Sequence, residues 1–362
     1  MKKKIGLFIL TLLVVGFGCW EQAQAASTKT IKQTINQLVK QKGFSGTITV
    51  VKNGRVIIQT SRGYANYAKK QPNRSQNQYQ IASIQKSMTA EMIAKLASQK
   101  KLSLNDKLSK YYPKIKNADQ VTLRQLLNMV SGLKVSSTIS LHSFKSQQAY
   151  LNYLGSHATI QTNKIGQWQY SSFNYNLLAG IVEQVSGKSY QQYFKQVIAK
   201  PLGIKNYSFV TKFSSNVAQG YYNRGLSHYQ TASKLGKTNQ YMSFGAGTIA
   251  MSGQDLYKVL AAMLSGKLIG TGNAQDLYSS KYLSGTTYTA GFYHVGQQLI
   301  KNQATYHMHG RQSGVDTAVE ISADGQNAVI VQSNNGTLTS GGTINHVIDL
   351  PIYKKLVGYD DN

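Results

Sequence analysis

Short β-rich runs lie near both ends of the 362-residue chain, and mostly helical patterns fill the part between them. Near the N-terminus, residues 47–51 and 56–60 flank Asn53-Gly54, a pair that is typical of a tight hairpin turn. Four further strand-like runs lie near the C-terminus, at residues 291–295, 304–308, 317–321 and 328–332. This order predicts an α+β fold (an α/β sandwich), in which an antiparallel sheet is completed by both termini and flanked by helices.

The region between the strands predicts an inserted, mostly helical subdomain. Apolar residues at helical spacing indicate a helix that begins near Ser83, and shorter helical segments are expected at residues 121–130, 173–186 and 189–199. Ser252, with Asp255 three residues later, is typical of a helix start.

Helices are also expected close to the two ends, at residues 28–41 and about 344–356. We expect a single domain at residues 27–357. Its sheet part is expected at about 27–80 and 285–357, and its helical part at about 81–284.

Residues 1–25 have the three parts of a secretory signal peptide. A basic start is followed by an apolar stretch at residues 5–20, and Ala23-Gln24-Ala25 offers small residues for cleavage. We therefore expect export with cleavage near Ala25. The alternatives are lipid attachment at Cys19 and a retained anchor, for which the apolar run is slightly short of the ~20 residues that span a membrane. Any membrane contact would be made through this segment alone.

The net charge of +27, from 40 basic and 13 acidic side chains, favours an anionic partner. For an exported protein we expect anionic cell-wall polymers at the cell surface and exclude nucleic acid. Cys19 is the only cysteine, so the mature chain has no disulfide and no thiolate metal site.

A serine three residues before a lysine can form a nucleophile and base pair, but this spacing occurs three times, at Ser83 and Lys86, Ser98 and Lys101, and Ser131 and Lys134. Only Ser83 follows a strand-like run and opens a helix. There, side chains three residues apart share a face, and the free backbone N–H groups favour negative charge. The alternative is that Ser83 caps the helix and Lys86 is a solvated charge.

Two other groups of residues can carry chemistry. Tyr170-Ser171-Ser172 precedes a helix, and a tyrosine beside a lysine can be pushed toward phenolate and relay protons. His307-Met308-His309-Gly310-Arg311 lies in a late strand, whose N–H groups could complete an oxyanion hole. His307 and His309 would face the same side of that strand, but no third ligand is evident, so we expect no metal.

The order of these segments resembles the serine β-lactamase and penicillin-binding-protein superfamily, in particular its class C-like, D,D-carboxypeptidase-like branch. The resemblance covers about residues 43–357. The segments that carry it include Phe44-Ser45-Gly46-Thr47, residues 81–90 around Ser83, residues 101–108, Thr122 to Leu127, Ser131-Gly132-Leu133, Tyr170 to Glu183 and Pro201-Leu202-Gly203-Ile204.

This resemblance implies that Ser83 is the acylated nucleophile, Lys86 its base, and Tyr170 the residue that activates or protonates. It implies no metal or organic cofactor. The family's second motif ends in Asn where this chain has Ser172, and its third motif reads Lys/His-x-Gly. Here either His309-Gly310-Arg311 occupies the third motif, with Gly one place early, or Met308-His309-Gly310 does, with Met308 in the basic position.

Similar departures occur in the surface enzymes that remove D-alanine esters from teichoic acids, which this chain also resembles. The first hypothesis is therefore a teichoic acid D-alanyl esterase, with Ser172, His309, Gly310 and Arg311 binding the substrate. The second is a penicillin-binding D,D-carboxypeptidase that acts on peptidoglycan stem peptides, or a weak β-lactamase. The third is a non-catalytic wall-binding module.

Overall fold

The computed structural model describes residues 28–359, apart from 138, 140–143, 223–228, 230, 234–240, 284, 296–303 and 337–342. The expected signal peptide at residues 1–25 lies outside the described residues. In the described part of the chain, no helix is both long enough and apolar enough to cross a membrane.

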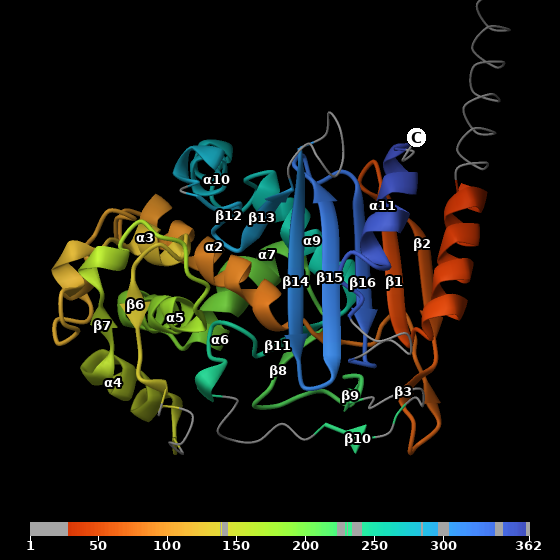
Figure 1. Cartoon of the computed structure of the whole chain (residues 1–362), viewed down its shortest axis with the longest axis horizontal. Helices are drawn as coiled ribbons and strands as arrows, with labels where there is room; N and C mark the ends of the chain where they lie inside the picture. Colours follow the sequence, from red (N-terminus) through yellow and green to blue (C-terminus); the bar gives the residue numbers. More distant parts are fainter. Residues whose placement is uncertain are drawn as a thin grey trace, which may run out of the picture.

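Seven antiparallel strands form the main sheet in the order β12-β13-β14-β15-β16-β1-β2 (Figure 1). β1 (Gly46–Lys52) pairs with β16 (Ala328–Ser333), so segments from both ends of the chain complete the sheet, as predicted. The other strands are β2 (Arg55–Arg62), β12 (Tyr288–Thr289), β13 (Phe292–Val295), β14 (Thr305–Gln312) and β15 (Val315–Ser322).

Local sequence explains the two hairpins that matter most for the sheet. Asn53 and Gly54 both have positive φ, 51° and 75°, as the predicted tight turn between β1 and β2 requires. β14 continues four residues beyond the predicted end at Met308, because its second half pairs with β15, including Gly310 with Thr317 and Arg311 with Asp316. This extension places the His309-Gly310-Arg311 segment in the sheet.

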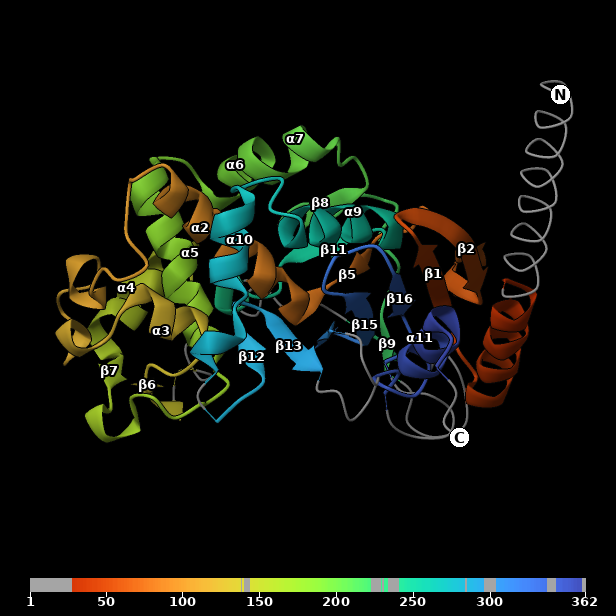
Figure 2. The same cartoon turned by 90° about the horizontal axis from the view of Figure 1, so that it is seen from above.

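The sheet is buried on both faces, with alternate residues facing opposite sides. In β16, Val329 and Val331 pack with the helix at residues 28–42 and with α11 (Asp349–Val357). Ala328 and Ile330 belong to the larger core that includes α9 (Gly253–Leu264). Figure 2 shows the two terminal helices on one side of the sheet and α9 on the other.

The helical part lies beside the sheet and is built around α2 (Gln85–Ser98) and α5 (Ser172–Ser186), which pack against each other (Figure 1). The other helices are α3 (Leu123–Leu127), α4 (Gln147–His157), α6 (Tyr190–Phe194), α7 (Lys200–Leu202) and α10 (Thr271–Leu277). A three-stranded sheet of β5 (Tyr79–Gln80), β11 (Ile249–Met251) and β8 (Tyr207–Phe209) lies near the start of α2.

Three helical boundaries differ from the sequence expectation. Ser83 lies in a 3₁₀ turn, η1 (Ala82–Ile84), and α2 begins only at Gln85. The segment at 189–199 changes from α6 to a π-helical turn at Lys195–Ala199. The last helix begins at Asp349 rather than near residue 344, so that Pro351 falls in its first turn, where its missing N–H costs nothing.

Burial of β1 between the two layers predicts a large difference between two valines of the same hairpin. Val50 is fully buried and Val56 is 37% exposed. Val50→Ala should lower the free energy of unfolding by about 2 kcal/mol, because it removes buried methyl groups and leaves a cavity. Val56→Ala should change it by less than about 0.5 kcal/mol. Urea unfolding followed by circular dichroism measures both, and equal losses would contradict the two-layer packing.

Candidate active site

Ser83 is held at the junction between β5 and α2 by an unusual backbone turn. Ala82, directly before it, has a φ of 44°, which non-glycine residues rarely adopt. The N–H of Ile81 donates to the carbonyl of Ile249 in β11 (2.9 Å), so the turn is fixed on its N-terminal side. As a result, the half-buried Ser83 side chain leaves the chain just before the first turn of α2.

The Ser83 hydroxyl contacts both of the other residues in the predicted catalytic group. Lys86 Nζ lies 2.9 Å from Ser83 Oγ, and the Tyr170 hydroxyl donates a hydrogen bond to the same oxygen over 2.8 Å. Lys86 Nζ also lies 5.0 Å from the centre of the Tyr170 ring. The start of α2 and the segment before α5, which are far apart in sequence, thus bring the Ser83 hydroxyl, the Lys86 amine and the Tyr170 phenol into contact.

Lys86 is 1% exposed, and burial lowers its pKa to about 7 because the ammonium form loses its hydration. A substantial fraction of Lys86 is therefore a neutral amine near neutral pH. The neutral amine has a lone pair that can accept the proton of the Ser83 hydroxyl at 2.9 Å.

The surroundings of Tyr170 favour its neutral phenol over the phenolate. Burial raises its pKa, and the hydrogen bond with Ser83 lowers it to a smaller extent. The residue as a whole is 41% exposed, while its hydroxyl contacts Ser83. The protonated hydroxyl can therefore donate the hydrogen bond to Ser83 Oγ.

The other two Ser-x-x-Lys pairs do not form such contacts. Ser98 lies at the exposed end of α2, where its hydroxyl donates to the carbonyl of Lys95. Ser131 is buried and donates to Asn174 Oδ1 over 2.7 Å. The bond from Ser131 to Asn174 ties the Ser131-Gly132-Leu133 segment to the start of α5, so Ser131 has a structural role.

Two residues outside the predicted catalytic group of Ser83, Lys86 and Tyr170 hold the Ser83 turn in place. Gln85 is fully buried, and its Oε1 accepts hydrogen bonds from the backbone N–H groups of Thr248 (2.5 Å) and Ile249 (2.9 Å). Its position inside an otherwise ordinary helical pattern offers no sequence signal for this role. Gly310 supports the turn from β14: a Cβ there would lie 2.2 Å from the Ile81 carbonyl oxygen and 2.9 Å from Ser83 N.

A pocket of about 660 Å³ opens next to Ser83 and Tyr170. Alternate residues of β14 line it, namely His307, His309 and Arg311, while Met308 is buried in the core. This alternation places His309 and Arg311 in the pocket lining, whereas Gly310, on the same face of β14 as Met308, lies against the Ser83 turn. The remaining lining residues are Thr287, Tyr293, His294, Val295, Asn345 and His346.

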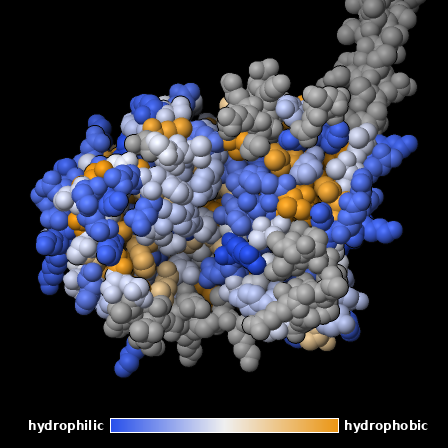
Figure 3. All heavy atoms as spheres, in the orientation of Figure 1, coloured by the Kyte–Doolittle hydropathy of each residue, from blue (hydrophilic) through white to orange (hydrophobic). Residues whose placement is uncertain are grey.

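Not all predicted binding residues reach this pocket. Ser172 is the first residue of α5 and is partly exposed, but it lies outside the pocket lining. Arg311 Nη2 donates to the carbonyl of Gly336 over 2.6 Å, and His309 Nε2 lies 2.5 Å from the buried carboxylate of Asp316. Asp316 therefore orients His309, a partnership between adjacent strands that the sequence alone did not reveal. On the face of the molecule that Figure 3 shows, hydrophilic side chains occupy the middle, where the helical part meets the sheet.

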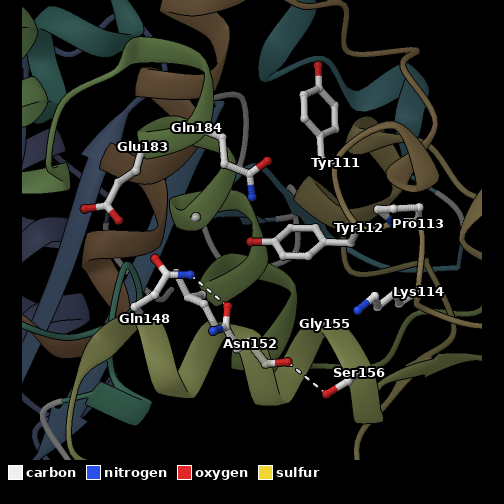
Figure 4. Close-up of a pocket in the computed structure, with 12 residues that line it drawn as sticks. Tyr111, Tyr112, Pro113, Lys114, Gln148, Asn152, Gly155, Ser156, Glu183 and Gln184 are labelled. Atoms are coloured by element: carbon white, nitrogen blue, oxygen red, sulfur yellow. Dashed lines mark hydrogen bonds between the residues drawn. The ribbon is translucent and has the colours of Figure 1, made fainter.

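A second cavity, of about 760 Å³, lies between α4, α5 and the segment around Tyr112 (Figure 4). Tyr112 reaches across it toward α5, where its hydroxyl donates to the carbonyl of Leu177. Its lining contains amide and hydroxyl side chains, including Gln148, Asn152 and Gln184, but not Ser83 or Lys86. This cavity is therefore separate from the pocket beside Ser83 and Tyr170.

Comparison with known families agrees with this arrangement. The profile of the Beta-lactamase family matches residues 31–350, which is most of the chain. The chain belongs to the Beta-lactamase family. Together with its relatives, this membership makes the protein a serine hydrolase.

Two curated relatives are informative. PbpX of Bacillus subtilis (strain 168), which carries a penicillin-binding-protein name, is 29% identical over 335 residues that cover 87% of this chain and 77% of that protein. A teichoic acid D-alanine hydrolase of Staphylococcus aureus (strain MRSA252) is 28% identical over 242 residues. That match covers 65% of this chain and 58% of the Staphylococcus protein, so the chain spans little more than half of that relative's length.

Solved structures confirm the predicted fold. FmtA from Staphylococcus aureus superposes with a TM-score of 0.75 at 24% identity, over 91% of this chain and 90% of FmtA. A D-amino acid amidase from Ochrobactrum anthropi superposes with a TM-score of 0.72 at 18% identity, over 92% and 98% of the two chains.

The low pKa of Lys86 predicts the pH dependence of acylation. The neutral amine is the competent form, so the rate of Ser83 labelling by a fluorophosphonate should rise as pH increases and level off above about 7. The labelling rate measured from about pH 5 to pH 9 gives this profile. Lys86→Gln should label far more slowly and without this inflection. A rate that falls across the same range would contradict a lysine base.

The close approach of β14 to the Ser83 turn predicts a strong effect of a single methyl group. Gly310→Ala places a Cβ against backbone atoms that cannot move independently, so it should displace Ser83 and slow its labelling about hundredfold. Gly272→Ala is the matched control, because a Cβ at Gly272 meets no atom within 4 Å. Equal labelling rates in the two variants would show that β14 does not position the turn.

Proposed function

We propose that the chain is an exported cell-envelope hydrolase that removes D-alanyl esters from teichoic acids through an acyl-enzyme at Ser83. In this proposal a signal peptide at residues 1–25 precedes a single hydrolase domain at residues 27–357. The partners are D-alanylated teichoic acid and other anionic polymers of the cell wall.

The observation that carries the proposal is the meeting of Lys86 Nζ and the Tyr170 hydroxyl at one oxygen, Ser83 Oγ, beside an open pocket. An amine with a pKa of about 7 can remove the hydroxyl proton, and a neutral phenol can give a proton to a leaving group. The same oxygen is within reach of both, so one nucleophile has a base and an acid at hand.

The proposed reaction has two balanced steps. Ser83 Oγ attacks the ester carbonyl while Lys86 takes the hydroxyl proton, and Tyr170 protonates the polymer's alcohol oxygen as the ester bond breaks. The Ser83 N–H and the N–H groups of β14, which Gly310 allows to approach, would stabilise the oxyanion. The Lys86 ammonium then returns its proton to Tyr170. Water attacks the D-alanyl ester of Ser83 while Lys86 takes a proton from the water, and Lys86 gives that proton to Ser83 Oγ as the ester bond breaks and D-alanine leaves.

The charge of the protein supports a polyanionic substrate. The net charge is +27, and the pocket lining includes Arg311 and the imidazoles of His294, His307, His309 and His346. Such a surface attracts phosphate-rich polymers and raises their local concentration. We propose that His309, Gly310 and Arg311 bind the substrate from β14, and that Ser172, which lies outside the pocket lining at the start of α5, contacts the polymer beyond the pocket.

The relatives support the same proposal, since one is named for the hydrolysis of D-alanine from teichoic acid. The similarity to PbpX favours a second candidate, a penicillin-binding D,D-carboxypeptidase of peptidoglycan or a weak β-lactamase. Both reactions would use the same three residues. The substrate bound by the pocket is what separates them.

A direct comparison of substrates tests the proposal. Purified enzyme is offered D-alanylated teichoic acid and a peptidoglycan stem peptide that ends in D-Ala-D-Ala, and free D-alanine is measured with a D-amino-acid oxidase. We expect release from the teichoic acid and its loss in Ser83→Ala. Ser98→Ala, which alters another Ser-x-x-Lys pair on the exposed end of α2, should release D-alanine at the normal rate.

The outcomes separate the three hypotheses. Release from the stem peptide alone would replace the esterase by a carboxypeptidase. Release from neither substrate, together with no labelling of Ser83 by a fluorophosphonate, would leave a non-catalytic wall-binding protein.

Raised salt should slow hydrolysis of the polymer more than that of a small uncharged ester, because salt screens the attraction between the basic surface and the phosphates.

A further inference from the structure

Four side chains that can ligate a metal meet in one wall of the Ser83 pocket. His307 of β14 and Glu320 of β15 are directly paired across the two strands. His346 precedes α11, and Asp349 is its first residue. One ligand atom from each residue lies within 4.8 Å of the corresponding atoms of the other three.

The two carboxylates of this cluster are completely buried. The side chains of Glu320 and Asp349 are both 0% exposed. Glu320 Oε1 has a partner in His307 Nδ1 at 2.8 Å. Among the described residues, Glu320 Oε2 and both oxygens of Asp349 have no hydrogen-bond partner apart from a weak contact of Asp349 with the N–H of Leu350.

Such an arrangement needs a cation or a bound proton to compensate it. Buried carboxylates without full hydrogen bonding are costly, and two of them side by side also repel each other. The nearest contact of Asp349 with an imidazole is 3.9 Å, from Oδ2 to His307 Nδ1, which is too long for a hydrogen bond. The start of α11 favours a negative charge only modestly.

We propose that His307, Glu320, His346 and Asp349 form a binding site for one divalent transition-metal ion, with Zn²⁺ as the best match. Two imidazole nitrogens and two carboxylate oxygens suit Zn²⁺ and its neighbours, whereas Ca²⁺ and Mg²⁺ prefer all-oxygen sites. The ion gives a partner to the buried oxygens that otherwise have none.

Three of the separations are already near those of a zinc site, and the widest among the four ligand atoms, at most 4.8 Å, has to close by up to about 1.5 Å. Ligand atoms at about 2.0–2.1 Å from a tetrahedral zinc lie about 3.3 Å from one another. His307 Nδ1 is 2.8 Å and His346 Nδ1 is 3.4 Å from Glu320 Oε1, so these atoms already have nearly the required separation. The 3.9 Å gap between Asp349 and His307 has to close by about half an ångström.

His346 reaches the cluster from the segment before α11. Its ring centre lies 4.2 Å from that of His307. Its side chain is 40% exposed and lines the Ser83 pocket. The ion therefore has a path of entry from the pocket, through the only exposed member of the four.

The competing account is a metal-free polar cluster, in which bound protons alone neutralise the buried carboxylates. Both accounts keep the four side chains together. They differ in whether the cluster takes up a stoichiometric metal ion, which can be measured without any substrate.

The test uses the purified full chain, freed of metal with a chelator and then titrated with ZnCl₂. Bound zinc per chain is measured by mass spectrometry of the metal, affinity by calorimetry, and the unfolding temperature with and without zinc. Asp349→Asn and His346→Gln remove one ligand each. His294→Gln is the matched control, because His294 lines the same pocket but its imidazole bonds Thr289 instead.

We expect one zinc ion per chain and a higher unfolding temperature in the wild type and in His294→Gln. Asp349→Asn and His346→Gln should weaken binding at least about tenfold, since even outer partners of a metal site change affinity by that factor. His346 is exposed, so His346→Gln should fold even if Asp349→Asn does not. No binding by the wild type, or undiminished binding by His346→Gln, would overturn the proposal.

Discussion

The burial of the Lys86 amine is the constraint on which the rest of the active site depends. At 1% exposure the side chain has lost its water, and the pKa of about 7 follows from that loss. Its Nζ contacts Ser83 Oγ and, more distantly, the carbonyl of Ala246 at 3.4 Å. A carboxylate beside Lys86 would stabilise its ammonium form. In the described part of the chain no ion pair includes Lys86.

Water is excluded from the Lys86 side chain only if its surroundings are closely packed, and three parts of the fold pack around it. α5 packs against α2 on one side, and Gln85 binds the backbone that leads into β11 on another. β14 closes the third side, where Gly310 lies directly against the backbone of Ile81 and Ser83. The sheet and the helical part therefore meet at the nucleophile, which explains why the pocket is found at their junction.

Sequence reasoning succeeded where the signal is local. The Asn53-Gly54 turn and the helix start at Ser252 follow from turn chemistry and capping. The completion of the sheet by both ends followed instead from the order of strand-like and helical runs along the chain. The spacing of Ser83 and Lys86 was less informative, because the same spacing recurs at Ser98 and Ser131. Burial and hydrogen bonding separate the three pairs, and neither can be read from spacing.

Contacts between distant segments could not be predicted in the same way. The pairing of His309 with Asp316 depends on the register of β14 and β15, which the strand pattern alone does not give. Glu320 reaches His307 through the pairing of β14 with β15, whereas Asp349, 29 residues after Glu320, reaches it because α11 returns to the sheet. The sequence showed two histidines in one strand without a third ligand, whereas the fold brings His307 to three partners and gives His309 a different one.

The central claim is that Lys86 is an amine of low pKa in contact with the nucleophile. A titration of the protein with ¹³C-labelled lysine side chains, followed by NMR, measures it directly. One lysine signal should titrate near 7 and be absent from Lys86→Met, while exposed lysines titrate at about 10.4. If every lysine titrates at about 10.4, Lys86 is a charged residue and the proposed base does not exist.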